Sequence, residues 1–216
     1  MSTTRQGTPR VAIDIETVPL GEYGSALDPD RGAVEAFGAW GYGEDGQPVR
    51  LALHVAQLEG GTAAEREKNL LVTVAETVSQ LGAVEIIGWN SSAFDMPFLA
   101  RRYVEHGLGR LAPQLVDTGR VGKYGTPIYE AAWLGLAHRD ICEEWQELAE
   151  EAGVRWSLKP VATACGLNPI EVDQTKIAEM SRDEVLAYQL SDVRVTYELD
   201  SIPPHERAAA IRRHAA

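Results

Sequence analysis

The sequence lacks the marks of a membrane, secreted or disulfide-bonded protein. No apolar run approaches the length that spans a bilayer, and the polar first residues contain no apolar segment of the kind found in signal peptides. The two cysteines, Cys142 and Cys165, lie far apart and in no paired motif. We interpret them as reduced thiols instead of a disulfide or a zinc site. These absences favour a cytoplasmic protein.

Basic residues are also scarce. The chain has 20 Lys and Arg against 32 Asp and Glu, a net charge of −12. Such a charge argues against a protein that coats nucleic acid with a broad basic face. It does not exclude an enzyme that grips a short strand locally, because metal-binding carboxylates themselves add negative charge.

The length and composition fit one domain with a full core. The chain has 216 residues, of which 44% are hydrophobic and 24% charged, as in ordinary globular domains. No internal repeat is visible. We expect a disordered leader over residues 1–9, a single domain over 10–202, and a short tail over 203–216 that follows Pro203 and Pro204.

Apolar runs and helical spacing predict four strands and five helices. The predicted strands cover residues 11–18, 36–42, 49–58 and 84–89, and the predicted helices cover 63–81, 94–106, 141–152, 158–165 and 182–199. Residues 107–137 contain several glycines and prolines and favour no particular element. This order predicts an α/β domain, a mixed β-sheet flanked by helices on both faces.

Two carboxylates stand two residues apart in the first predicted strand. Because side chains alternate along a strand, Asp14 and Glu16 project from the same face. They repel each other and lose solvation beside a core, and a bound cation would relieve both costs. A strand end where both acids reach water is the competing explanation, and the pair alone leaves both open.

Two further acids have simpler explanations when each is taken alone. Asp95 begins a predicted helix, where a carboxylate accepts backbone N–H bonds and suits the helix dipole. Tyr188 and Asp192 are four residues apart and share one face of the last predicted helix. A half-buried tyrosine beside a solvated aspartate would look the same.

The four acids together indicate metal chemistry. Asp14, Glu16, Asp95 and Asp192 are each placed at the end of an element or on a defined face. Four carboxylates suit hard divalent ions such as Mg²⁺ or Mn²⁺. Two such ions, about 3.5–4 Å apart, can clamp the attacking and leaving oxygens of a phosphoryl displacement.

Three motifs resemble those of the DEDD 3′–5′ exonucleases, which belong to the DnaQ-like, ribonuclease-H-like superfamily. They are Ile13-Asp-Ile-Glu-Thr-Val18, Gly88-Trp-Asn-Ser-Ser-Ala-Phe-Asp-Met-Pro-Phe-Leu99 and Tyr188-Gln-Leu-Ser-Asp192, and they span almost the whole chain. Each motif is weak alone, but the ordered set is specific. Tyr188 matches the tyrosine subtype, called DEDDy, because Ala187 occupies the place of the histidine in the other subtype.

Further details are similar to the stand-alone relatives of the proofreading exonuclease domain of family B DNA polymerases. Asn90 precedes Phe94 and Asp95 with that family's spacing. Two other segments resemble family motifs, namely His138-Arg-Asp140 and Ser157-Leu-Lys-Pro-Val-Ala162 with its continuation Cys165-Gly-Leu167. The resemblance implies a ribonuclease-H-like fold.

The resemblance also implies hydrolysis of phosphodiester bonds from a free 3′ end, with two divalent ions, Mg²⁺ or Mn²⁺, as cofactors. Asp14 would bridge both ions, Glu16 and Asp192 would complete the site of the ion that activates water, and Asp95 would hold the second ion through water. Tyr188 would position the attacking water. Single-stranded DNA is the favoured substrate.

The resemblance suggests further contacts to the substrate. Thr17 and Asn90 are candidates for holding the 3′-terminal nucleotide, while Phe94 would either stack on a base or belong to the core. We expect His138 and Asp140 to be a structural pair. Lys159 could contact a phosphate or be solvated, and the sequence fits both equally. Arg101 and Arg102 could also contact the strand backbone, but solvation is favoured for these arginines.

Three alternatives stay open at this stage. A 3′–5′ exoribonuclease would use the same acids and tyrosine, because RNA selection depends on contacts to the 2′-hydroxyl. A non-catalytic binding module is disfavoured, since all four acids are kept. A proofreading subunit that depends on a replication or repair protein partner would suit the acidic charge.

Overall fold

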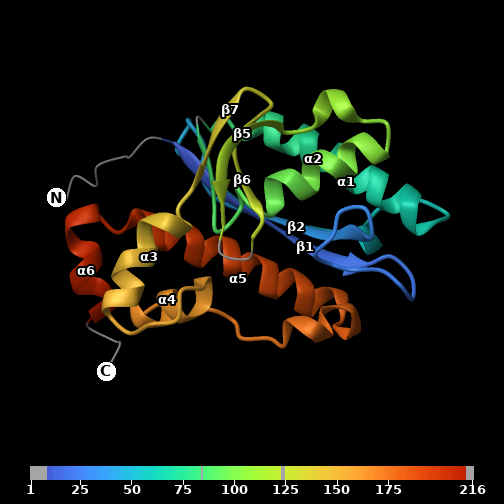
Figure 1. Ribbon diagram of the computed structural model, residues 1–216. Helices are drawn as coiled ribbons and strands as arrows, with labels where there is room; N and C mark the ends of the chain where they lie inside the picture. The colour runs from blue at the N-terminus through green and yellow to red at the C-terminus, as the bar shows by residue number, and fades with distance from the viewer. Residues whose placement is uncertain (1–8, 84, 123–124, 213–216) are drawn as a thin grey trace.

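The computed structural model describes residues 9–83, 85–122 and 125–212. Seven strands form one mixed sheet with the spatial order β3-β2-β1-β4-β7-β6-β5 (Figure 1). The strands are β1 (Arg10–Pro19), β2 (Gly32–Tyr42), β3 (Pro48–His54), β4 (Glu85–Gly88), β5 (Gln114–Val121), β6 (Pro127–Trp133) and β7 (Leu136–Asp140). The helices are α1 (Ala63–Gln80), α2 (Asp95–Glu105), α3 (Cys142–Glu151), α4 (Leu158–Ala164), α5 (Arg182–Ser201) and α6 (Pro204–Arg212).

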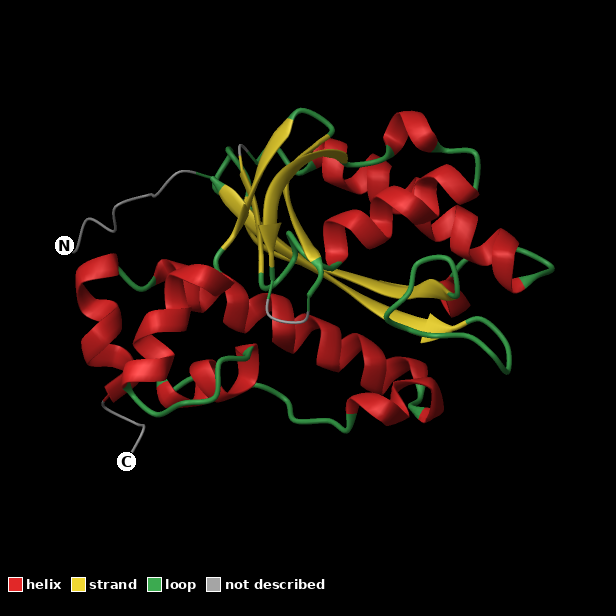
Figure 2. Cartoon of the chain, viewed as in Figure 1, coloured by secondary structure: helices red, strands yellow, loops and turns green. Residues whose placement is uncertain are grey.

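Strand β1 is central to the sheet, antiparallel to β2 and parallel to β4. Its side chains alternate between two cores, which the helices close from opposite sides (Figure 2). Val11, Ile13 and Ile15 belong to the core on the side of α1 and α2, whereas Ala12 belongs to the core formed with α3 to α6. The residues between the apolar ones, Asp14 and Glu16, therefore face the side of α5.

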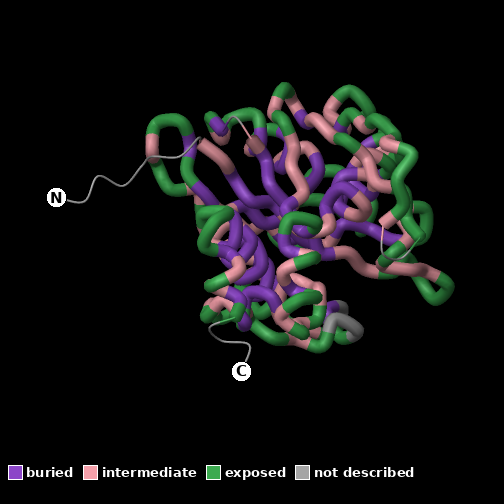
Figure 3. The backbone as a smooth tube through the Cα atoms, turned by 60° about the vertical axis from the view of Figure 1, so that its left-hand side comes forward, coloured by how far each residue is buried: buried purple, intermediate pink, exposed green. Residues whose placement is uncertain are grey.

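The sheet and the helices against it hold most of the buried chain (Figure 3). Helix α5 packs against β2 and β1, and α1 packs with residues such as Leu70 and Leu71 fully buried. The mixed sheet with helices on both faces confirms the fold class that the sequence predicted.

The main departure from the sequence prediction lies in residues 107–137. This segment, for which no element was predicted, contains β5, β6 and the first two residues of β7. The pattern was obscured because β5 is an edge strand with an irregular register between Asp117 and Arg120 and with Val116 and Val121 largely exposed. The expectation of mostly helices after β4 is therefore wrong.

Smaller differences concern the ends of elements. Strand β2 begins at Gly32, four residues before the predicted start, and β3 ends at His54 because a 3₁₀ turn follows at Val55–Gln57. The His54 side chain accepts a bond from the backbone of Ala56 and caps this turn. The predicted tail contains α6, whose Ile211 is buried in the core beside α3.

Parts of the predicted segments fall outside the described residues. Residues 1–8 of the expected leader, and Val84 of the expected fourth strand, lie outside the described residues. Among the helices in the described ranges, none combines the length and the apolar content needed to cross a bilayer. Both cysteines are free, as expected.

Candidate metal site

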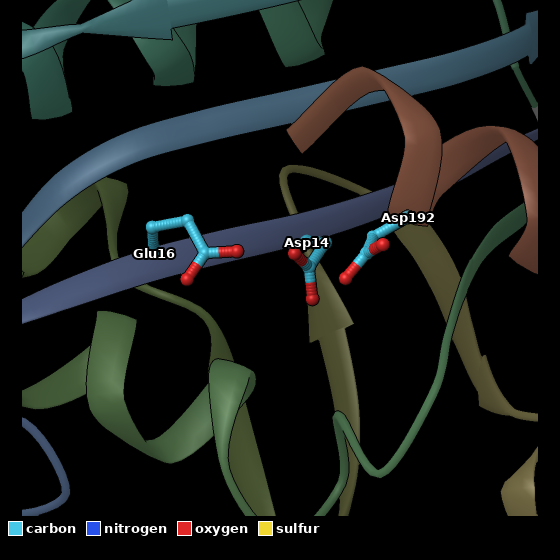
Figure 4. A group of neighbouring side chains, drawn as sticks. All are labelled: Asp14, Glu16 and Asp192. Carbon is cyan, nitrogen blue, oxygen red and sulfur yellow. The ribbon is translucent and has the colours of Figure 1, made fainter. Parts of the chain in front are cut away.

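Three carboxylates from two distant segments meet on the α5 side of the sheet. Asp14 and Glu16 of β1 and Asp192 of α5 each offer an oxygen, and these oxygens all lie within 4.8 Å of one another. Figure 4 shows the three side chains converging between the strand and the helix. The shared face predicted for Asp14 and Glu16 is confirmed.

Helix α5 comes close to the acids because the neighbouring strand, β2, has a glycine at this point. Gly38 of β2 is paired with Asp14, and a Cβ at Gly38 would come within 2.7 Å of Cγ of Gln189. The amide of Gln189 donates a hydrogen bond from Nε2 to Oδ2 of Asp14, 2.8 Å away. The absence of a side chain at Gly38 thus lets α5 lie directly over the strand that carries the acids.

A β-bulge lies beside Glu16. Glu16 is paired with Ala36 but Thr17 with Val34, so β2 contains one extra residue, Glu35. The N–H of Val34 donates to Oε1 of Glu67 on α1. Bulges re-aim side chains and are common beside functional sites.

Arg102 holds this bulge through Glu67. Its guanidinium donates to both Glu67 oxygens, at 2.8 and 2.6 Å, and the pair is buried. The solvated position that the sequence favoured for Arg102 is therefore wrong. Arg101 is exposed and forms an ion pair with Asp30.

Asp95 joins the cluster from the first turn of α2. It is buried, and its Oδ1 accepts a hydrogen bond from the backbone N–H of Ile15 at 3.1 Å. Burial raises the pKa of Asp95, and hydrogen bonds, among them one with Asp14, partly oppose this rise. The position of Asp95 at the start of a helix was correctly predicted, and its carboxyl group also contacts β1, the strand that carries Asp14 and Glu16.

Burial raises the pKa of all four acids, and repulsion within the group adds to the rise for Asp14 and Glu16. Burial is the first cause in each case; it raises the pKa of Glu16 to about 8, of Asp95 to about 7 and of Asp192 to about 6. The pKa of Asp14 is raised well above its usual value by burial and then by its three acidic neighbours. Groups this close do not all ionise near neutral pH unless a cation compensates them.

The unsatisfied oxygens at the site fit a divalent cation. Among the described residues, Oδ1 of Asp192 and Oε1 of Gln189 are buried and have no hydrogen-bond partner. Buried polar atoms are rarely left unpaired. Hard oxygen donors are the ligands that Mg²⁺ and Mn²⁺ prefer, so these residues suit such an ion.

Tyr188 and Lys159 both lie beside Asp192. Tyr188 is buried, and its side-chain hydrogen bond partly opposes the rise that burial causes in the pKa of Asp192. The Nζ of Lys159 lies 3.8 Å from the centre of the Tyr188 ring and 3.7 Å from Oδ2 of Asp192. A solvated Lys159 is thus excluded, and the sequence could not have shown which acid it accompanies.

Of the three candidate substrate contacts, Thr17 adjoins Glu16 and Phe94 adjoins Asp95 in the sequence, while the backbone N–H of Asn90 donates to Asp140. Thr17 donates from its hydroxyl to the carbonyl of Ala26 at 2.6 Å. Asn90 has a positive φ of 57°, and Phe94 packs on Phe98 with ring centres 5.5 Å apart at the edge of the core. Their contacts to a nucleotide remain predictions.

His138 and Asp140 support the loop that leads to Asp95. Asp140 accepts hydrogen bonds from the backbone N–H groups of Asn90, Ser92 and Cys142, at 2.9, 2.9 and 3.0 Å. The Nε2 of His138 lies 2.8 Å from Oγ of Ser91, and burial lowers the pKa of His138 to about 4. The structural role expected for both residues fits these contacts.

Comparison with known proteins gives a fold relationship. No protein-family model matches the sequence, and no curated protein matches it. The structure is similar to that of the family B DNA polymerase from the hyperthermophilic archaeon Pyrobaculum calidifontis, with a TM-score of 0.60, 22% identity and coverage of 94% of this chain. The chain spans 27% of the length of that polymerase.

This similarity shows a common fold. The chain has the ribonuclease-H-like mixed sheet that its motifs predicted, and a buried group of acids that could bind metal lies on the α5 side of that sheet. At this level of identity, the activity of the polymerase is not carried over by the fold.

Proposed function

We propose that the chain is a divalent-metal-dependent 3′–5′ exonuclease of the DEDDy type that acts on single-stranded DNA and releases mononucleotides. The meeting of Asp14, Glu16 and Asp192 within 4.8 Å carries the proposal. Three further observations concern the same carboxylates: the alternation of side chains along β1, the missing side chain at Gly38, and the raised pKa of Glu16. We infer that the exonuclease part of the similar polymerase accounts for the shared fold.

The residues of the chain would divide the work as follows. Asp14, Glu16, Asp95 and Asp192 would hold two divalent ions, Mg²⁺ or Mn²⁺, which would lower the pKa of the attacking water and neutralise the scissile phosphate. Tyr188 would orient that water by a hydrogen bond, since a phenol with an ordinary pKa near ~10 is a poor base. Gln189 would hold Asp14 in place through its amide.

The substrate end of the site would be built from the neighbouring loops. Thr17 directly follows the strand acids, and the loop at Asn90 is fixed by Asp140. We propose that Thr17 and Asn90 hold the 3′-terminal nucleotide and that Phe94 lies against its base. The net charge of −12 suggests that strand binding is local, weak and assisted by metal.

Digestion of matched 5′- and 3′-labelled DNA and RNA oligonucleotides, with Mn²⁺ or with EDTA, tests this function. A ladder that shortens from the 3′ end of single-stranded DNA only with Mn²⁺ is the expected result. Faster loss of the RNA would replace DNA by RNA as the substrate. No trimming of either strand, together with no Mn²⁺ binding by calorimetry, would refute the proposal.

A partner requirement is tested separately. If the isolated chain binds Mn²⁺ but trims neither strand, addition of a replication or repair protein that restores trimming would make it a partner-dependent subunit. Gel filtration of the mixture would show whether a complex forms.

A further inference from the structure

The ammonium group of Lys159 is a buried cation whose donors are unused. The side chain is 11% exposed, and among the described residues Nζ has no hydrogen-bond partner. Its nearest carboxylate oxygen, Oδ2 of Asp192, is 3.7 Å away, which is too long for a hydrogen bond. An ammonium has three donors, so all three remain for another acceptor.

The geometry explains why Lys159 does not simply close on Asp192. The face of the Tyr188 ring lies 3.8 Å from Nζ and attracts the cation. Pro160 follows Lys159 in the first turn of α4, a position that suits the fixed backbone of proline. Helix α4 packs on α5, which carries both Tyr188 and Asp192. The lysine is therefore preorganised beside the acids.

An incompletely paired buried ammonium is costly. Burial raises the pKa of both Glu16 and Asp192, and the charge of Lys159 opposes this rise, so its field reaches the centre of the acidic cluster. A lysine that served only as a counterion would gain by forming a short bond with Asp192. The long distance between Nζ and Asp192 and the unused donors of Nζ instead suit a hydrogen bond to a bound anionic ligand.

We propose that Lys159 is a catalytic residue whose ammonium donates a hydrogen bond to a non-bridging oxygen of the phosphate that is cut. This inference rests on the proposed function, because it assigns the phosphate to the same site. The step needs no proton transfer from Lys159, which supplies a fixed positive charge as the phosphate is attacked. Lys159 also holds the Tyr188 ring, so that the hydroxyl stays on Asp192.

The test compares Lys159→Met with the parent protein and with Lys68→Met, a matched change at an exposed lysine of α1. Binding of thymidine 5′-monophosphate at saturating Mg²⁺ is measured by calorimetry, and Mn²⁺-dependent trimming gives kcat and KM. We expect at least about tenfold weaker nucleotide binding and a kcat about 10²–10³-fold lower. Lys68→Met should match the parent in both.

The outcomes separate this inference from the proposed function. Nucleotide binding equal to that of the parent, or an unchanged kcat, would make Lys159 a structural counterion and overturn the inference. A parent protein that neither trims a strand nor binds Mn²⁺ would refute the proposed function. If the parent binds metal without trimming, the nucleotide titration still judges Lys159. If Lys159→Met is unstable by thermal unfolding, Lys159→Gln, which stays polar but loses the charge, replaces it in the same comparison.

Discussion

Gly38 lies opposite Asp14 across the β1–β2 pair, and Gln189 occupies the space that a side chain at Gly38 would need. Asp14 accepts its hydrogen bond from this same glutamine. A residue with no side chain on β2 therefore fixes how close α5 comes to the acids on β1.

We expect Gly38→Ala to separate α5 from the acids. The new Cβ would lie 2.7 Å from Cγ of Gln189, so the unfolding free energy should fall by about 1–3 kcal/mol and Mn²⁺ should bind more weakly. Chemical denaturation and calorimetry measure the two effects. Gly109→Ala is the control, because the nearest atom to its Cβ is an ordinary 3.7 Å away; equal behaviour of the two variants would contradict the role of Gly38.

Asp14→Ala should abolish metal-dependent 3′ trimming while the fold survives. The loss should be at least about 10²–10³-fold. Because burial, and then repulsion by its three acidic neighbours, disfavours the Asp14 carboxylate, the metal-free variant should be no less stable than the parent. Trimming assays and thermal unfolding check both points, with exposed Glu22→Ala as the control. Full activity of Asp14→Ala would disprove the assigned site.

The metal-free protein should lose stability as the pH rises. The folded pKa values of Asp192, Asp95 and Glu16, about 6, 7 and 8, lie above those of the unfolded chain, so their contribution is complete below about pH 4 and is lost as the pH passes through 6 to 8. The melting temperature in EDTA should fall over this range.

Added Mg²⁺ should restore the melting temperature most at the alkaline end, because the carboxylates must be ionised to bind it. Glu16→Gln should flatten the pH profile of the metal-free protein. A melting temperature in EDTA that is constant from about pH 5 to 8, or that rises, would contradict the burial of these acids.

Tyr188→Phe should lower kcat by about 10²-fold and leave KM nearly unchanged, since the hydroxyl is proposed to act on the water and not on the strand. The ring contact to Lys159 is kept in this variant. Steady-state kinetics on a labelled oligonucleotide separate the two constants. Kinetics identical to those of the parent would rule out the tyrosine-type mechanism here.

Asp200→Asn should destabilise the protein without changing the chemistry. The Asp200 side chain is 4% exposed and pairs with Arg10 and Arg139, so removal of its charge should cost up to about 3–5 kcal/mol. The control Glu198→Gln breaks a more exposed pair with Arg194 and should cost about 0–1 kcal/mol. Denaturation curves give both values. A loss for Asp200→Asn as small as that for Glu198→Gln would show that the buried ion pairs contribute little to stability.

Local rules predicted the parts of the site that depend on one element. Alternation along β1 placed Asp14 and Glu16 on one face, and helical spacing put Tyr188 and Asp192 together on α5. Neither rule could show that Gln189 bonds Asp14 or that Lys159 accompanies Asp192, because those contacts depend on how α4 and α5 pack.

The edge of the sheet was harder to predict for a different reason. Strand β5 has largely exposed valines at positions 116 and 121 and an interrupted register, so it shows little of the alternation that marks a half-buried strand. Arg102 was misjudged in a similar way, because its burial comes from Glu67 on α1 and not from its own neighbours in sequence.

The bond between Gln189 and Asp14 joins residues 175 positions apart. On a ribosome, β1 with Asp14 and Glu16 is synthesised before α5, because the chain is made from its N-terminal side. The carboxylate cluster therefore cannot assemble on a nascent chain until α5 has left the exit tunnel. A translation product that stops before Arg182 would carry Asp14 and Glu16 without Asp192, and would therefore lack the proposed metal site.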